Sequence, residues 1–253
     1  MEHPYLSILM YHQVGEFEKV TRLKANFCHI QRFEQQMRFL KYWNYNVISL
    51  TDAIKGLKGE IALPKHSVVI TFDDGYENFY DYAYPILKEL QFPSTVYAVA
   101  GLVGKSSDWL YEDDIKPAPL MTVAQMREVQ QHGVDFGSHA ITHPRLSKLE
   151  PEQMRKEVSE SKSMLEATLD RPVEHICYPY GDHDDAVVEA SREAGYLTGT
   201  TIVKGSSWAQ HDPLALPRKA ISFNDSLYRF WRNMHFKHGK QEANLVNKPI
   251  KQA

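Results

Sequence analysis

The chain has 253 residues, of which 43% are hydrophobic and 24% are charged. This length fits one large α/β domain, and this composition excludes a largely disordered or fibrous protein. The chain has 29 lysines and arginines and 32 aspartates and glutamates, which gives a net charge of −3. This charge provides no positive potential that would attract a phosphate backbone, so nucleic-acid binding is not expected.

Short apolar runs alternate with amphipathic segments along the chain. The first run, 6–11, is uninterrupted, as is typical of a strand buried on both faces of a parallel sheet. From 30 to 43, apolar residues repeat at helical spacing. Thr51 is the expected N-cap of a short helix that ends at Leu57. Further strands are predicted at 45–50, 67–72, 94–99, 134–138, 175–178, 197–203 and 215–221, and further helices at 80–90, 120–131, 151–169, 184–194 and 226–236.

Strands and helices in this alternation indicate βα units and a parallel sheet. Seven or so repeats in roughly 240 residues favour a closed or nearly closed barrel over a small open sheet. Two stretches break the pattern. Residues 101–119 form a long irregular insertion that contains Trp109 and Tyr111, and residues 237–253 form a polar tail with four lysines that we expect to be poorly ordered. We therefore expect a single α/β domain over residues 1–236.

The apolar runs are too short for a membrane protein. None approaches the roughly 18 residues that a membrane helix needs. The run Tyr5–Tyr11 is too short for the core of a signal peptide and lacks a basic leader, so a cytoplasmic protein is predicted if Met1 is the natural start. The two cysteines, Cys28 and Cys177, are too few for a disulfide framework, and each is interpreted as a small buried hydrophobic residue.

Two adjacent carboxylates follow the most strand-like run of the chain. Asp73 and Asp74 stand directly after 67–72, and Gly75 then permits a sharp turn. Because the carboxyl ends of strands face the active site of a parallel barrel, both aspartates would arrive there. One could bind a metal while its neighbour accepts a proton. The alternative is that the pair only caps the following helix.

Two histidines follow another predicted strand. His139 and His143 are four residues apart, which would place them on one side of a helical turn, where both can bind one metal ion. A chain with twelve histidines often produces this spacing by chance, so the position after a strand is the stronger evidence. An aspartate and two histidines form a three-ligand set that leaves room for water and substrate, as catalytic zinc sites require.

Two further strand ends carry candidate residues. Proline and glycine flank Tyr180 and restrict the backbone, which could aim the Tyr180 N–H at a developing oxyanion. The alternative is an ordinary turn with tyrosines that pack in the core. His12 closes the first strand and could serve as a general acid, although a lone histidine is more often structural. Four strand ends thus converge on one predicted site.

Thr-Phe-Asp-Asp-Gly at 71–75 and Ser-His-Ala-Ile-Thr-His-Pro at 138–144 together resemble the polysaccharide deacetylases with a NodB-homology domain, the carbohydrate esterases of family four. The resemblance covers roughly 5–236. It implies a distorted (β/α)7, TIM-like barrel and the metal-dependent removal of acetyl groups from N-acetylated sugars. Carried over by position, the resemblance implies that Asp73 is the general base. It implies that Asp74, His139 and His143 are the metal ligands and that the backbone N–H of Tyr180 binds the oxyanion.

The chain departs from the family pattern at two points. The third family motif carries an arginine shortly before Pro-Tyr/Phe-Gly, but this chain reads Ile-Cys-Tyr at 176–178, and the usual C-terminal Leu-x-His motif is absent. Residues 9–12 are similar to the start of the circularly permuted poly-N-acetylglucosamine deacetylases of biofilm systems, which makes His12 the candidate acid. Arg218 is our candidate for the residue that orients Asp73.

The expected function is the hydrolysis of the N-acetyl group of an amino sugar or of a carbohydrate that contains N-acetylglucosamine. Zinc is the expected metal, and cobalt or nickel would also fit the ligands. Trp109, Tyr111 and Trp208 could stack on sugar rings, although packing in the core or in a lid would explain each equally well. A cytoplasmic location would favour a lipid-linked, nucleotide-linked or oligosaccharide precursor as substrate. The alternatives are a hydrolase of another small amide, such as a formamido sugar or a ureide, and a degenerate carbohydrate-binding barrel without turnover.

Overall fold

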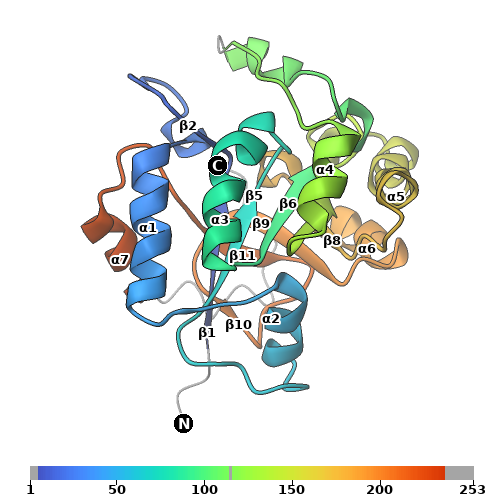
Figure 1. Ribbon diagram of the computed structural model, residues 1–253. Helices are drawn as coiled ribbons and strands as arrows, with labels where there is room; N and C mark the ends of the chain where they lie inside the picture. The colour runs from blue at the N-terminus through green and yellow to red at the C-terminus, as the bar shows by residue number, and fades with distance from the viewer. Residues whose placement is uncertain (1–4, 114–115, 237–253) are drawn as a thin grey trace.

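The computed structural model describes residues 5–113 and 116–236, and its centre is a closed barrel of seven parallel strands (Figure 1). Each strand pairs in parallel with the next, and the last returns to the first. In chain order the strands are β1 (Tyr5–Tyr11), β5 (Ser67–Phe72), β6 (Ser94–Ala98), β7 (Val134–Ser138), β8 (His175–Cys177), β9 (Thr198–Lys204) and β11 (Leu216–Ala220). The predicted α/β barrel is confirmed, and the predicted tail at 237–253 lies outside the described residues.

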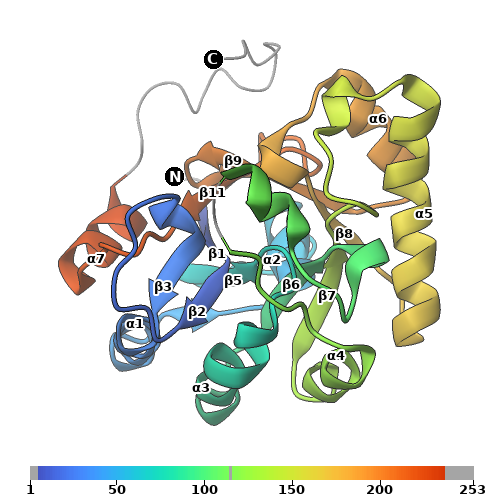
Figure 2. The same cartoon turned by 90° about the horizontal axis from the view of Figure 1, so that it is seen from above.

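In the described part of the chain, six helices flank the barrel, and the view from above shows how they are arranged around it (Figure 2). They are α1 (Ile30–Tyr42), α3 (Tyr84–Leu90), α4 (Val123–Gln130), α5 (Pro151–Leu169), α6 (Asp185–Glu193) and α7 (Leu227–His235). A seventh helix, α2 (Leu50–Leu57), covers the amino ends of the strands, where Leu50 and Ile54 pack against Leu6 and Val69. Among the described residues, no helix combines the length and the apolar character needed to cross a membrane.

The first strand shows why an uninterrupted apolar run suits this fold. Leu6 and Ile8 belong to the cluster that contains α2 and fills the barrel interior. Leu9 and Tyr11 face outward, where the Tyr11 ring packs edge-on against Phe33 of α1 at a centroid distance of 5.3 Å. Because successive side chains of a strand point to opposite faces, both faces of β1 must be apolar.

Three predicted boundaries were wrong. Ser49, not Thr51, is the N-cap of α2, because the Ser49 hydroxyl accepts a hydrogen bond from the Asp52 N–H at 3.0 Å. The helix therefore starts earlier and leaves only β4 (Asn46–Val47) of the strand predicted at 45–50. The helix predicted at 80–90 begins as a π-helical turn, Phe79–Ala83, before it becomes α3.

Three short strands were not predicted. They are β2 (Gln13–Gly15), β3 (Phe27–His29) and β10 (Ser207–Trp208). The first two pair with each other, and β10 pairs antiparallel with the amino end of β1. A strand of two or three residues is too short to show a period of two, so the hydrophobic pattern carries no signal for it.

The insertion predicted at 101–119 is anchored at the carboxyl end of the barrel. Its described part includes a 3₁₀-helical stretch at Asp108–Asp113. Isolated β-bridges join Ser106 to Pro119 and Tyr76 to Leu120, and Leu110 packs with Tyr76 and Leu120. Since Tyr76 lies just beyond β5, this packing places the insertion over the strand that ends in the two aspartates.

Candidate functional site

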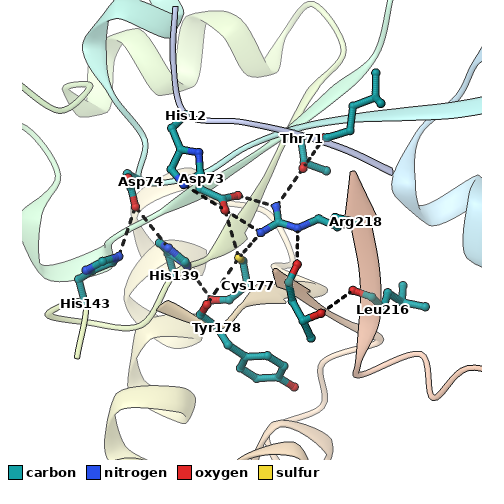
Figure 3. Close-up of polar contacts among 12 residues, drawn as sticks. His12, Thr71, Asp73, Asp74, His139, His143, Cys177, Tyr178, Leu216 and Arg218 are labelled. Carbon is teal, nitrogen blue, oxygen red and sulfur yellow. Dashed lines mark hydrogen bonds and ion pairs between the residues drawn. The ribbon is translucent and has the colours of Figure 1, made fainter. Parts of the chain in front are cut away.

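The predicted site residues gather at the carboxyl ends of the barrel strands. Figure 3 shows six of them together, contributed by the ends of β1, β5 and β7 and by β11: His12, Asp73, Asp74, His139, His143 and Arg218. The ring of Tyr180, from the turn after β8, lies 4.6 Å from that of His143, measured between centroids. The barrel thus brings all seven candidates to one end.

Asp73 and Arg218 form a buried bidentate ion pair. The two Nη atoms of Arg218 donate to the two carboxylate oxygens of Asp73 at 2.6 and 2.7 Å, and the two residues are only 1% and 3% exposed. Arg218 also donates to the Thr71 hydroxyl at 3.0 Å and to the Thr201 carbonyl at 2.9 Å. These extra bonds fix the guanidinium plane, and the paired oxygens of Asp73 take their orientation from it.

The ion pair sets the charge of Asp73. Burial by itself raises the pKa of the Asp73 carboxyl, but the charge and hydrogen bonds of Arg218 outweigh burial and lower that pKa below its usual value. Conversely, burial lowers the pKa of Arg218, and the charge of Asp73 raises it overall. Asp73 is therefore ionised at neutral pH and can accept a proton.

Asp74, His139 and His143 form a second buried group beside this pair. The Nε2 atoms of both histidines lie 3.3 Å from Asp74 Oδ1, and one ligand atom from each of the three residues falls within 4.8 Å of the others. Asp74 Oδ1 nevertheless makes no hydrogen bond to any described residue.

The hydrogen-bond partner of His139 fixes the tautomer of its neutral ring. Its Nδ1 lies 2.7 Å from the Cys177 carbonyl oxygen, which can only accept, so Nδ1 carries the hydrogen. In the neutral ring, Nε2 then presents a lone pair toward Asp74. The lone pair and the carboxylate oxygen both carry negative charge density and repel each other unless a cation lies between them. Metal ligands are arranged in this way around an ion. The three residues therefore fit a divalent metal ion.

The backbone between the histidines differs from the prediction. His139 and His143 do not lie on a helical turn: the segment after β7 is an irregular loop, in which Ala140 and His143 have φ of 62° and 65°. The prediction relied on spacing alone, although Pro144 disfavours a right-handed helical conformation at the residue before it. The loop still brings the two imidazole centroids within 4.9 Å.

Left-handed backbone is concentrated at this site. Of the nine non-glycine residues with positive φ in the described part of the chain, four lie here: Asp74, Ala140, His143 and Tyr180. Each such residue costs about 1–2 kcal/mol. Strain of this kind persists only where the surrounding structure enforces it, and it clusters at functional sites.

His12 points toward Asp73 from the end of β1 (Figure 3). Its Nε2 lies 3.8 Å from Asp73 Oδ2, and its side chain is 14% exposed, against 3% for that of Asp73. Its Nδ1 is buried without a hydrogen-bond partner among the described residues, so no protein group fixes its tautomer. This placement allows His12 to reach both solvent and a group held near Asp73.

Cys177 has a larger part in the site than its sequence interpretation suggested. It is fully buried, as expected, but its Sγ accepts a hydrogen bond from Arg218 Nη2 at 3.0 Å and lies 3.6 Å from Asp73 Oδ2. The signal was its position shortly before Pro179, in the stretch where the resembling family carries an arginine and this chain reads Ile-Cys-Tyr. Here Arg218 reaches Asp73 from β11 instead, and the Cys177 thiol contacts both.

Aromatic residues line one side of the metal-ligand set. Trp109, from the insertion, stacks on His143 at a centroid distance of 4.3 Å, and the guanidinium of Arg145, which was not predicted, lies 4.3 Å from the Tyr180 ring. The side chain of Tyr111 lies outside the described part of the chain. Trp208 pairs with Tyr5 at the opposite end of β1, so it cannot stack on a sugar bound at this site.

Comparisons with known proteins identify the family. A family model described as polysaccharide deacetylase matches residues 60–199. YxkH of Bacillus subtilis, which is named as a polysaccharide deacetylase, is 30% identical over 217 residues, which are 86% of this chain and 71% of YxkH. The poly-beta-1,6-N-acetyl-D-glucosamine N-deacetylase of Staphylococcus aureus is 26% identical over 232 residues, 87% of this chain and 77% of that enzyme.

Solved structures agree with this assignment. The deacetylase PplD of Streptococcus pyogenes, in complex with acetate, matches with a TM-score of 0.80 and 28% identity over 92% of this chain and 100% of PplD. IcaB of Ammonifex degensii shares the fold, with a TM-score of 0.75 and 21% identity over 92% of this chain and 98% of IcaB. The chain belongs to the polysaccharide deacetylase family, and it is a hydrolase of carbon–nitrogen bonds other than peptide bonds.

Proposed function

We propose that the protein removes the N-acetyl group from an amino sugar in an N-acetylglucosamine-containing oligo- or polysaccharide and depends on a divalent metal. The observation that carries the proposal is the proximity of two groups: the ionised Asp73, held by Arg218, and the buried set of Asp74, His139 and His143. One side-chain atom of Asp73 and one of His139 lie within 4.8 Å of each other. The named substrate of the Staphylococcus aureus relative and the acetate in PplD support the choice of substrate.

Two imidazoles and a carboxylate suit zinc, and they would also accept cobalt or nickel. When bound, such an ion polarises the amide carbonyl and lowers the pKa of a water molecule towards ~7. Asp74, His139 and His143 would hold it and leave its remaining positions open to solvent and substrate.

The other residues divide the proton transfers between them. Asp73 accepts a proton from the attacking water, and Arg218 keeps its carboxylate in one orientation. The backbone N–H of Tyr180 donates to the developing oxyanion. His12 gives a proton to the departing sugar nitrogen, and the C–N bond breaks to yield acetate and a free amine. The distance of 3.8 Å between His12 and Asp73 lets base and acid serve the same amide.

Metal removal is the first test of this proposal. After chelation, acetate release from N-acetylglucosamine oligomers of increasing length is expected to stop, and added Zn²⁺ or Co²⁺ is expected to restore it. The measurement is enzymatic detection of acetate, with bound metal quantified in the same samples. Undiminished release from protein shown to be free of metal contradicts metal dependence. No release along the whole series, from protein shown to hold metal, contradicts this substrate class and favours another amide.

Substitution of His12 tests the proposed acid. His12→Asn is expected to lower kcat for the amide substrate ~10²-fold, because an amine must be protonated as it leaves. The acetate ester of a nitrophenol needs no such proton, so its hydrolysis is expected to change far less. The measurement is the ratio of the two kcat values in wild type and variant. Equal losses on the two substrates would rule out His12 as the acid.

A further inference from the structure

The loop between the two histidines is attached to helix α5 by a single buried carboxylate. Glu157 of α5 is 6% exposed. Its Oε2 accepts hydrogen bonds from the backbone N–H groups of Ile141 and Thr142 at 2.7 and 3.0 Å. Its Oε1 accepts a hydrogen bond from the Thr142 hydroxyl at 2.7 Å. The partners of this buried charge thus lie between His139 and His143.

The backbone of this loop depends on such acceptors. An irregular loop has no helix or sheet ladder, so each buried N–H needs an acceptor elsewhere. The His139 N–H finds the Ala98 carbonyl at 2.9 Å. The Ala140 N–H finds the Ser138 hydroxyl at 3.1 Å. The next two N–H groups share Glu157, and without it both would lose their acceptor.

The same two residues stand between points of backbone strain. Ala140 precedes them and His143 follows them, and both have left-handed φ. The carbonyls of Ala140 and Ile141 accept hydrogen bonds from the Ala100 and Gly101 N–H groups at 2.9 Å, so the loop is fixed on its carbonyl side. Glu157 fixes the N–H side, and without it we expect the strained residues to relax and the distance between the imidazoles to change. A carboxylate accepting backbone N–H groups forms strong, charge-assisted bonds, which suit this task.

We propose that Glu157 is a positioning residue that sets the spacing of His139 and His143 for metal binding. This inference rests on the proposed function, because it takes Asp74, His139 and His143 as the metal ligands. Groups that orient metal ligands without touching the metal change metal affinity by about 10–100-fold when they are removed. Glu157 orients two ligands at once, through the peptide units between them.

The variants separate hydrogen bonding from charge and from stability. Glu157→Leu keeps much of the volume and removes all three bonds. Glu157→Gln can keep them, because its amide oxygen accepts from the two N–H groups while its NH₂ donates to the Thr142 hydroxyl. Thr142→Val removes one bond at an exposed position and is the milder variant. Val158→Ala, at a fully buried neighbour on the same helix, destabilises the core and keeps every group that takes part in the three bonds of Glu157.

The experiment measures the Kd for Co²⁺ by competition with a chromophoric chelator, and it records the visible spectrum of bound Co²⁺. For each variant, kcat and KM are measured with saturating metal, and Tm is measured as well. Glu157→Leu is expected to raise Kd at least ~10-fold, to alter the Co²⁺ spectrum and to lower kcat with little change in KM. Thr142→Val should raise Kd by a smaller factor. Glu157→Gln should stay close to wild type, and Val158→Ala should lower Tm without changing Kd.

Three results would overturn the inference: wild-type Co²⁺ affinity in both Glu157→Leu and Thr142→Val, an equal loss of affinity in Val158→Ala, or a loss in Glu157→Gln as large as in Glu157→Leu. In each of these, wild-type protein still binds Co²⁺ and the proposed function stands. Wild-type protein that binds neither Co²⁺ nor Zn²⁺ would instead contradict the proposed function and remove the ground of the inference.

Discussion

Asp73→Asn is expected to lower kcat at least ~10²-fold, because the amide cannot accept a proton from the attacking water. Unlike the loss in His12→Asn, this loss should extend to the nitrophenyl ester, since attack by water precedes the departure of either leaving group. The measurement is kcat on both substrates at a temperature where the variant is folded, with metal content matched to wild type. A metal-loaded, folded variant with nearly full turnover would exclude Asp73 as the base.

The temperature of the assay matters because Asp73→Asn is also expected to lower the free energy of unfolding. In wild type both Arg218 Nη atoms donate to Asp73. An asparagine offers one acceptor oxygen and places an NH₂ group against the other N–H, so a buried guanidinium loses its counter-charge. Breaking one partner of a buried pair costs roughly 3–5 kcal/mol. Activity measured on partly unfolded protein would therefore overstate the catalytic role.

Arg218→Met is expected to lower the free energy of unfolding by about 3–5 kcal/mol, because it leaves the Asp73 carboxylate buried without a cation. The measurement is urea-induced unfolding followed by circular dichroism, with the slope of the transition compared between variants. The exposed ion pair of Arg38 with Glu34, on the surface of α1, provides the control. Arg38→Met removes an arginine as well and should change stability far less, because solvent screens an exposed ion pair.

The double variant Asp73→Asn/Arg218→Met completes a double-mutant cycle with the two single variants. With both charges gone, no unpaired ion remains in the barrel, so the double variant should be more stable than either single variant. Strictly additive losses would mean that the two side chains do not interact as the structure shows them. Turnover should stay low in the double variant, which would separate the stability of the pair from its part in catalysis.

The fold was predictable where the sequence signal is local. The runs at 6–11 and 67–72 are buried on both faces, so their uninterrupted apolar residues indicate strands directly. The polar residues that follow them stand at strand ends, and in a parallel barrel those ends meet. From the sequence alone, this reasoning places His12, Asp73 and Asp74 at one end of the barrel.

The remaining features depend on contacts between distant segments. A glutamate in the middle of a charged helix is ordinary, and only the loop amides that face Glu157 distinguish it. The hydrogen bond of Cys177 to Arg218 joins β8 to β11, and no local pattern reports it. The helical turn predicted for His139 and His143 was wrong because a spacing of four is only compatible with a helix. Pro144 disfavours a helix locally, and the hydrogen bonds to Glu157 of α5 hold the loop in its irregular conformation.

The position of β1 between β5 and β11 governs when this site can form. Closure of the barrel pairs Leu9 with Lys219. On a ribosome that adds about 5–20 residues per second, β1 emerges on the order of 10–40 s before β11. In the last part of that interval the nascent chain holds Asp73, Asp74 and both histidines but not Arg218, so Asp73 lacks its counter-charge and β1 has an open edge. Barrel closure and the pairing of Asp73 with Arg218 therefore occur together, once β11 has emerged.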